Sequence, residues 1–182
     1  MANKNYTPVI QIVGHPGCGK TTLMVELIEG LIAKGISVAT LKHSAHNHEL
    51  DKPGKDSFLH RQAGANPAVM MSGTMSAIYF TRKNGQSPDD LIRQYLSGVD
   101  IVLIEGWISG PYKKIEVFRK GCSREPLFNS VDNVKAFITD TCDCLLEREL
   151  AAKKGLAVYD RSAEDCFLNF ILSLAKYNII PS

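Results

Sequence analysis

The sequence predicts an α/β fold built on a doubly wound, mostly parallel sheet. Three observations carry this prediction. A glycine-rich loop at residues 14–21 lies between an apolar run and a helical pattern near the start of the chain. Further short apolar runs alternate with helical patterns along the rest of the chain, which is typical of such sheets. One of the later runs ends in a carboxylate, at Glu105.

The glycine-rich loop fits the phosphate-binding pattern G-x-x-x-x-G-K-[ST]. Its glycines let the backbone curl so that several N–H groups point toward phosphate oxygens, and the helix that follows adds positive potential. Lys20 supplies a full charge near the outer phosphates, and the Thr21 hydroxyl is placed to reach Mg²⁺. The loop therefore predicts a P-loop NTPase-type nucleotide site. Its candidate binding residues are Gly14, Pro16, Gly17, Cys18, Gly19, Lys20, Thr21 and Thr22.

Length and composition favour one domain that spans residues 1–182, with a hairpin excursion at about 68–81. Hydrophobic residues make up 45% of the chain, which is enough for a sizeable core. The net charge of +2 gives no reason to expect a nucleic acid or a membrane surface as partner. No apolar run approaches the ~20 residues of a membrane span, and the polar start of the chain has no signal-peptide pattern. A cytoplasmic location is expected.

The first strand, helix and second strand are predicted from residues 9–41. Val9–Val13 is long enough for one buried strand, and leucine and isoleucine then recur at helical spacing up to Gly35. Small and β-branched residues at 36–41 predict the second strand. Together these elements form a βαβ unit, which implies a parallel sheet.

The middle of the chain predicts a short helix and a hairpin. The helix is expected over residues 56–64, where it ends at a glycine. Two apolar segments, 69–71 and 77–80, flank Ser72-Gly73-Thr74-Met75 and predict a β-hairpin. A second helix is expected to start at Pro88.

The second half of the chain predicts the rest of the sheet. Residues 99–104 are apolar except for Asp100, which suits a central strand covered on both faces. The last helix is expected to begin at Ser162, with Asp165 at the spacing of a capping box. Three further strands are expected at 114–118, 134–138 and 156–159.

Two groups of residues are expected beside the phosphate loop, because ligands bind at the carboxyl ends of strands in open α/β sheets. Glu105 ends the central strand, so its carboxylate is placed to hold Mg²⁺ or to orient an attacking water. The polar stretch 42–57 follows the second strand and contains three histidines, His43, His46 and His48. These histidines are suited to a transition metal, to phosphate or a partner, or to a solvated loop.

The five cysteines do not predict a disulfide framework, because their number is odd and their spacing irregular. Cys142 and Cys144 form the one close pair. A single C-x-C lacks the spacing of structural zinc, so free thiols are expected there. Cys18 lies inside the phosphate loop, where oxidation would obstruct nucleotide binding.

Four segments occur together in the order found in one known family. They are Gly14–Thr22, Leu41-Lys42-His43 with His46, Asp51-Lys52-Pro53-Gly54-Lys55-Asp56-Ser57, and Leu103-Ile104-Glu105-Gly106. With these segments the chain resembles the molybdopterin-guanine dinucleotide biosynthesis protein B family, from about Val9 to Asp140. The segment that begins at Asp51 is far more specific than the phosphate loop.

The resemblance implies a GTP-binding protein with at most slow GTPase activity, in which Glu105 and Lys20 are the catalytic residues. Such a protein assists a molybdopterin guanylyltransferase, the partner that joins GMP to molybdopterin in molybdenum cofactor biosynthesis. The resemblance also implies a homodimer whose contact includes the hairpin. Molybdopterin is a further ligand that the resemblance suggests.

The resemblance also implies roles for individual residues. Thr21, Glu105 and Asp51 would hold Mg²⁺. Thr139 and Asp140 would read the base, because a carboxylate accepts the N1–H and N2–H of guanine, which adenine lacks. The full guanine motif N-K-x-D of common GTPases is absent. The loop that would meet the pterin or the partner contains His43, His46, Lys55, Asp56 and Ser57.

Three other classes of protein share part of this pattern. A metal-insertion GTPase of the nickel-enzyme maturation type has a similar phosphate loop and histidine loop, but its usual Cys-x-His site is absent here. An ATP-dependent small-molecule kinase needs an arginine-rich lid, whereas Arg61, Arg82 and Arg93 are scattered. A pterin-binding carrier without enzymatic activity is the third alternative.

Overall fold

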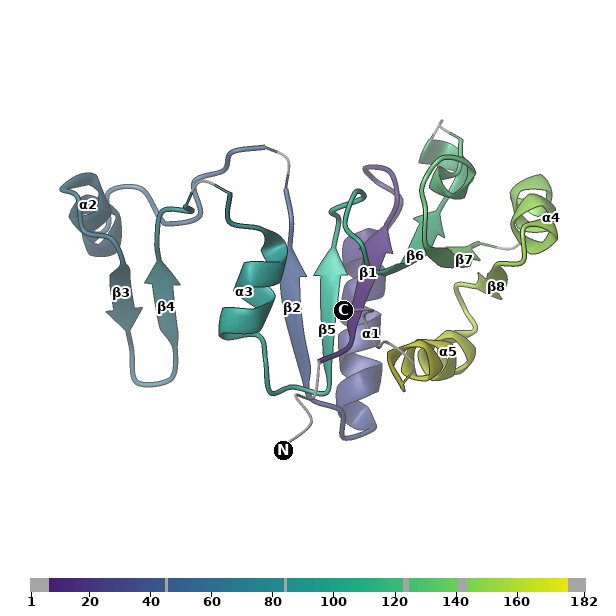
Figure 1. Ribbon diagram of the computed structural model, residues 1–182, viewed down its shortest axis with the longest axis horizontal. Helices are drawn as coiled ribbons and strands as arrows, with labels where there is room; N and C mark the ends of the chain where they lie inside the picture. Colours follow the sequence, from purple (N-terminus) through teal and green to yellow (C-terminus); the bar gives the residue numbers. More distant parts are fainter. Residues whose placement is uncertain (1–6, 45, 84, 123–124, 141–143, 177–182) are drawn as a thin grey trace. The chain divides into compact units, whose positions relative to one another are not determined.

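The computed structural model describes residues 7–44, 46–83, 85–122, 125–140 and 144–176 (Figure 1). The chain divides into two compact units. The first comprises Met1–Ser44 and Leu91–Ser182, and the second comprises Ala45–Asp90. None of the helices in the described ranges combines the length and the apolar character that crossing a lipid bilayer requires.

The first unit contains a six-stranded sheet with the strand order β2-β5-β1-β6-β7-β8. Every neighbouring pair in it is parallel, as the βαβ pattern predicts. Figure 1 shows β2, β5 and β1 pointing the same way, so their carboxyl ends share one edge of the sheet. The strands are β1 (Val9–Val13), β2 (Val38–Lys42), β5 (Ile101–Glu105), β6 (Lys113–Phe118), β7 (Val134–Thr139) and β8 (Ala157–Asp160).

The centre of the sheet is the predicted apolar run that becomes β5, paired with β1 in the register Ile12↔Glu105. All five residues of each of these two strands are buried. Asp100 interrupts the run because it lies just before the strand. Its carboxylate accepts hydrogen bonds from the Ser37 N–H at 2.8 Å and the Ser37 hydroxyl at 2.6 Å, which ties the starts of β5 and β2 together.

One face of the sheet is covered by α1 (Lys20–Ala33) and α5 (Glu164–Lys176). Their apolar side chains share a buried cluster with alternate residues of the strands, because successive strand residues point to opposite faces. Fully burying each such side chain stabilises the fold by about 1.5–3 kcal/mol. Large, fully buried members of this cluster include Phe167, Ile10, Ile12, Leu23, Leu27 and Leu31.

A second cluster, with Phe137 at its centre, forms around the neighbouring strands. Phe137 contacts Phe118 at a centroid distance of 5.5 Å and Phe128 at 5.1 Å. Phe128 belongs to a short 3₁₀ turn, η2 (Leu127–Asn129), and a similar turn, η1 (Lys120–Cys122), precedes it. The sequence predicts neither turn, because they are held by tertiary contacts rather than by a periodic pattern.

Two features at the carboxyl-terminal side differ from expectation. The helix α4 (Leu145–Lys153) is not predicted from the sequence, since leucines at its start are exposed and its apolar pattern is weak. The prediction that the last helix begins at Ser162 with a capping box is wrong. The helix α5 begins at Glu164, and the Ser162 hydroxyl donates a hydrogen bond to Asp160 Oδ1 at 2.5 Å.

The second unit contains α2 (Asp56–Gln62) and the predicted hairpin of β3 (Ala68–Met71) and β4 (Ser76–Tyr79). Ser72 closes its turn, because the Ser72 N–H donates to Met75 O at 2.8 Å and the Met75 N–H donates to Ser72 Oγ at 3.0 Å. Much of the hairpin's apolar surface is exposed, at Val69, Met70, Met71, Met75 and Ile78. A further helix, α3 (Pro88–Tyr95), starts at the end of this unit.

Candidate functional site

The phosphate loop connects β1 to α1 at the carboxyl edge of the sheet, as the sequence predicts. Gly17 and Gly19 adopt positive φ angles of 79° and 84°, a region that glycine enters without steric cost. Gly14 is constrained by space as well: a Cβ there would lie 2.4 Å from the carbonyl oxygen of Val117 on β6. Packing against β6 therefore requires a glycine at position 14, whereas the backbone conformation favours glycine at position 17.

Lys20 lies in the first turn of α1, and its ammonium group reaches back to the loop. Nζ donates hydrogen bonds to the carbonyl oxygens of Gly14 and His15, each at 2.9 Å. Burial lowers the pKa of Lys20, and the nearby Glu105 carboxylate partly offsets this effect. A cation held at the mouth of the loop, beside the N-terminus of a helix, is well placed to attract phosphate oxygens.

The carboxylate of Glu105 meets the phosphate loop at the end of β5. Glu105 Oε1 accepts a hydrogen bond from Thr21 Oγ1 at 3.0 Å and forms an ion pair with Lys42 Nζ at 2.8 Å. The Glu105 side chain is only 10% exposed, so this oxygen is held between two elements of the sheet edge. A hydroxyl and a carboxylate oxygen this close are the kind of ligands that Mg²⁺ prefers.

The residues after β5 and β2 are also close together. The His43 N–H donates to the Glu105 carbonyl oxygen at 3.0 Å, and a Cβ on Gly106 would lie 2.8 Å from the His43 carbonyl oxygen. Trp107 has a positive φ of 55°, which is uncommon for a bulky residue and often marks a functional site. Its ring lies 6.0 Å from that of His43.

The other side of the phosphate loop faces the ends of β6, β7 and β8. Thr139 and Asp140, the residues expected to read the base, lie at the end of β7. Arg119 follows β6 and pairs with Asp140 across 3.2 Å, and Arg161 follows β8. Sequence reasoning missed both arginines. The available signal was their position: Arg119 directly follows the predicted strand 114–118, and Arg161 lies two residues after the predicted strand 156–159.

A loop that follows β6 also reaches the phosphate loop. His15 Nε2 lies 2.9 Å from the carbonyl oxygen of Glu125. The same loop is fixed by the fully buried Glu116, whose carboxylate accepts hydrogen bonds from the N–H groups of Leu127 at 2.6 Å and Phe128 at 2.9 Å. Burial raises the pKa of Glu116 to about 7, against these two hydrogen bonds, which lower it.

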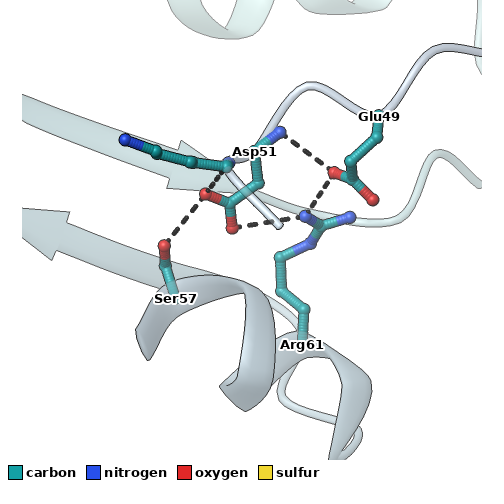
Figure 2. A network of polar contacts seen from close by, with 5 residues as sticks. Glu49, Asp51, Ser57 and Arg61 are labelled. Carbon is teal, nitrogen blue, oxygen red and sulfur yellow. Dashed lines mark hydrogen bonds and ion pairs between the residues drawn. The ribbon is translucent and has the colours of Figure 1, made fainter. Parts of the chain in front are cut away.

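Several of the expected site residues belong to the second unit. Figure 2 shows Asp51 at the centre of a polar network. One oxygen of its carboxylate accepts hydrogen bonds from the Ser57 hydroxyl at 3.0 Å and the Lys52 N–H at 2.8 Å, while the other lies 3.3 Å from Arg61 Nη1. Arg61 also pairs with Glu49 at 2.8 Å. The structure thus gives Asp51 a role in ordering this loop, and its role in metal binding stays a prediction.

The remaining candidates in this loop have less defined surroundings. The rings of His46 and His48 lie 6.2 Å apart. Lys55 directly precedes α2, and Asp56 is an exposed residue in the first turn of that helix. Among the residues that the structure describes, no three histidine, cysteine, aspartate or glutamate side chains gather as a metal site. The transition-metal interpretation of the histidines stays a prediction.

The cysteines differ from one another. Cys144 is free and buried, as expected, and Cys166 is free and exposed; Cys142 lies outside the described residues. Cys18, which is fully buried in the phosphate loop, is disulfide-bonded. The cysteine spacing had given no reason to expect a disulfide at this position.

With this geometry established, comparison with known proteins decides the family. The family model described as molybdopterin guanine dinucleotide synthesis protein B matches residues 9–140. The chain belongs to this family. The resemblance that the four sequence segments suggested is therefore confirmed.

Curated relatives carry a matching description. The molybdopterin-guanine dinucleotide biosynthesis adapter protein of Escherichia coli is 36% identical over 134 residues, which cover 69% of this chain and 74% of that protein. The Haemophilus influenzae protein of the same description is 38% identical over 117 residues, which cover 64% of this chain and 66% of that protein.

Solved structures of the family share the fold. Bacillus subtilis MobB superposes with a TM-score of 0.73 at 24% identity, covering 94% of this chain and 99% of that one. The homologue from Bacillus stearothermophilus gives a TM-score of 0.62 at 20% identity, covering 92% and 97%. At this level of identity the likeness concerns the fold, which is the P-loop NTPase-type α/β fold that the sequence predicts.

Proposed function

We propose that this protein binds GTP, hydrolyses it slowly, and acts as an adapter to a molybdopterin guanylyltransferase, the enzyme that attaches GMP to molybdopterin in molybdenum cofactor biosynthesis. The observation that carries the proposal is the meeting of Thr21 and Glu105 beside Lys20, in a chain of this family. The adapter role is what the curated relatives' names describe.

In this proposal the phosphates lie in the loop that begins α1. The backbone N–H groups of Gly17 and Gly19 face the phosphate oxygens, together with those of Thr21 and Thr22 at the helix N-terminus. Lys20 exchanges its two carbonyl partners for the outer phosphates, which supply stronger, fully charged acceptors. The lowered pKa of Lys20 rises again when phosphate charge lies beside it.

Thr21 and Glu105 are the residues that would hold Mg²⁺, because their oxygens already lie 3.0 Å apart. When bound, Mg²⁺ would neutralise charge on the phosphates. Lys42 shares the same Glu105 oxygen and balances its charge. Asp51 is also proposed to bind Mg²⁺, and the only support for this is that carboxylate oxygens are common Mg²⁺ ligands.

Slow turnover is the expected consequence of this set of residues. The acidic group proposed for the phosphate end is Glu105, and its Oε1 is engaged by Thr21 and Lys42. Arg119 and Arg161 are both paired with carboxylates. An unpaired arginine finger raises the rate of phosphoryl transfer by about 10³–10⁵. We therefore expect a partner protein either to supply an arginine or to free Arg119 or Arg161 from its carboxylate.

Base recognition is assigned in this proposal to Thr139 and Asp140. The Thr139 hydroxyl is buried and has no hydrogen-bond partner among the described residues, which supports a ligand or water at this strand end. The Asp140 carboxylate is half exposed and able to accept two N–H groups of guanine.

The proposal also includes a homodimer formed through the hairpin. The exposed apolar side chains of β3 and β4 support it, since such a patch on a small unit usually marks an interaction site. A Met71→Asp variant is expected to shift the protein to a monomer in analytical ultracentrifugation.

The loop residues His43, His46, Lys55, Asp56 and Ser57 are proposed to meet molybdopterin or the partner enzyme.

The central test is nucleotide binding by isothermal titration calorimetry. GTP is expected to bind with Mg²⁺ and to bind more tightly than ATP, and Lys20→Ala is expected to weaken it by at least about tenfold. Lys52→Ala, a lysine of the second unit, is the control. Preference for ATP would instead favour a small-molecule kinase.

The adapter role needs a separate test. The purified protein loaded with a non-hydrolysable GTP analogue is expected to capture a molybdopterin guanylyltransferase from cell extract, and Lys20→Ala is expected to capture less of it. Equal capture by both proteins would remove the nucleotide-dependent part of the proposal.

A further inference from the structure

Two arginines lie against Gly19, on the side of the phosphate loop that faces β6 and β8. A Cβ on Gly19 would lie 2.7 Å from Arg161 Nη1 and 3.5 Å from Arg119 Cζ. Each arginine has one carboxylate partner. Arg161 Nη2 lies 3.1 and 3.2 Å from the two oxygens of Glu26, and Arg119 Nε lies 3.2 Å from Asp140 Oδ2.

The two ion pairs differ in how firmly they are held. The Arg161 side chain is 12% exposed, and its Nη1 also donates to the Gly19 carbonyl oxygen at 3.4 Å. Arg119 and Asp140 are 45% and 50% exposed. An ion pair this exposed shifts an equilibrium by no more than about fivefold, so it separates readily. Arg161 is therefore a fixed part of the loop's surroundings, whereas Arg119 is free to leave its partner.

The register of the sheet explains why Arg119 meets Asp140. β6 and β7 pair Phe118 with Thr139, so Arg119 and Asp140 are the first residues beyond the ends of two adjacent strands. Thr139 Oγ1, directly before Asp140, is buried without a hydrogen-bond partner in the described part of the chain. A polar ligand is thus expected next to the Arg119–Asp140 pair, since buried hydroxyls are normally satisfied.

The chemistry of the pair matches that of a guanine base. The N1–H and N2–H of guanine form the donor edge of a guanidine-like group, and a carboxylate accepts both. The arginine guanidinium presents the same kind of donors to the same acceptor. Arg119 and a guanine base therefore compete for Asp140.

We propose that Arg119 is a specificity-determining residue that occupies Asp140 in the nucleotide-free protein and is displaced from it by guanine. The inference rests on the proposed function, because it takes Asp140 as the base-reading carboxylate. Guanine replaces one set of N–H donors with another, so Asp140 keeps a partner throughout. Adenine has no such pair of donors at this edge, so it could not take the place of Arg119 at the carboxylate.

The test compares GTP with tripolyphosphate, a probe that has the phosphates but no base. Removing Arg119 takes a positive charge away from both ligands, so the informative quantity is the ratio of the two dissociation constants. The ratio is the dissociation constant for GTP divided by that for tripolyphosphate. Arg119→Met is expected to lower this ratio by about two- to fivefold, because guanine no longer has a competitor at Asp140. Arg119→Gln is expected to do the same.

Two further variants show whether the effect passes through Asp140. Arg161→Met removes the same charge beside Gly19 without touching Asp140, and the ratio is expected to stay as in the wild type. In an Asp140→Asn background, Arg119→Met is expected to leave the ratio unchanged. An unchanged or raised ratio in the single Arg119 variants would overturn this inference alone, provided that the wild type binds GTP. Absence of GTP binding by the wild type would overturn the proposed function as well.

Discussion

Thr21 Oγ1 donates a hydrogen bond to Glu105 Oε1 at 3.0 Å, although 84 positions of sequence separate the two residues. The contact arises because β1 and β5 are parallel neighbours that end at the same edge, with Ile12 opposite Glu105. The first turn of α1 then brings Thr21 to the end of β5. Lys42, at the end of the next strand, shares the same oxygen at 2.8 Å.

This contact predicts a Mg²⁺-dependent role for the Thr21 hydroxyl. Thr21→Ala is expected to weaken GTP binding by roughly 10- to 100-fold in Mg²⁺, because an oxygen ligand to the cation is lost. The same variant is expected to bind GTP like the wild type in EDTA, where no cation is present. Thr21→Ser keeps the hydroxyl and serves as the control in calorimetric titrations. An equal loss in Mg²⁺ and in EDTA would contradict the assignment.

The surroundings of Gly14 and Gly17 predict that the protein tolerates an alanine better at position 17 than at position 14. Gly14→Ala places a Cβ 2.4 Å from a backbone carbonyl of β6, whereas Gly17→Ala meets nothing within 4 Å and has only an unfavourable φ. We expect Gly17→Ala to cost about 1 kcal/mol of unfolding free energy and Gly14→Ala at least about 2 kcal/mol. Urea denaturation of the two variants measures this difference. Equal losses would show that the space beside Val117 is not limiting.

The raised pKa of Glu116 predicts that the folded protein loses stability as the pH rises. Its pKa is raised from 4.5 to about 7 by burial, so the folded protein binds this proton more tightly than the unfolded chain does. The stability from this group is fully present below pH 4.5 and is lost as the pH rises through 7. Between pH 5 and pH 8 we expect the wild type to lose roughly 2–3 kcal/mol of unfolding free energy relative to Glu116→Gln.

Urea denaturation of both proteins over that pH range isolates the Glu116 contribution, because their other titrating groups are identical. Parallel pH profiles for the wild type and Glu116→Gln would show that the carboxyl is not the cause. Glu116 holds the loop that reaches His15, so the same titration is expected to alter the exposure of residues 119–131 to protease.

The hydrogen bonds and ion pair of Asp51 predict that replacing this residue disorders part of the second unit. Asp51→Asn removes the charge that Arg61 and Ser57 contact, and we expect a cost of about 1.5–3 kcal/mol with faster proteolysis within residues 45–90. Asp56→Asn, at an exposed position in the first turn of α2, is expected to cost about 0.5 kcal/mol.

The same Asp51 variant tests its expected role in metal binding. If Asp51 holds Mg²⁺, the loss of GTP affinity in Asp51→Asn will depend on Mg²⁺, as for Thr21→Ala. A variant that is proteolysed faster yet keeps the Mg²⁺ dependence of the wild type would confine Asp51 to ordering its loop.

The phosphate loop, the central strand ending in Glu105, and the hairpin were determined by the sequence alone. Each depends on local rules: glycine spacing for the loop, the apolar run at 101–104 for the strand, and a short polar turn between apolar segments for the hairpin. Family membership also followed from ordered segments such as Asp51–Ser57, and the family match bears it out. The helix α4 and the 3₁₀ turns escaped prediction because their periodic patterns are weak or absent.

The tertiary structure alone decided which side chains meet. Strand order is set by long-range pairing, and it places Arg119 beside Asp140 and Arg161 beside Gly19. The position of each arginine near the end of a predicted strand does not say which side chain it meets. It also decided that Glu116 is buried and that the Asp51 carboxylate is held by Ser57 and Arg61. Local patterns specify elements, whereas the contacts of a polar side chain depend on where the packed sheet brings its neighbours.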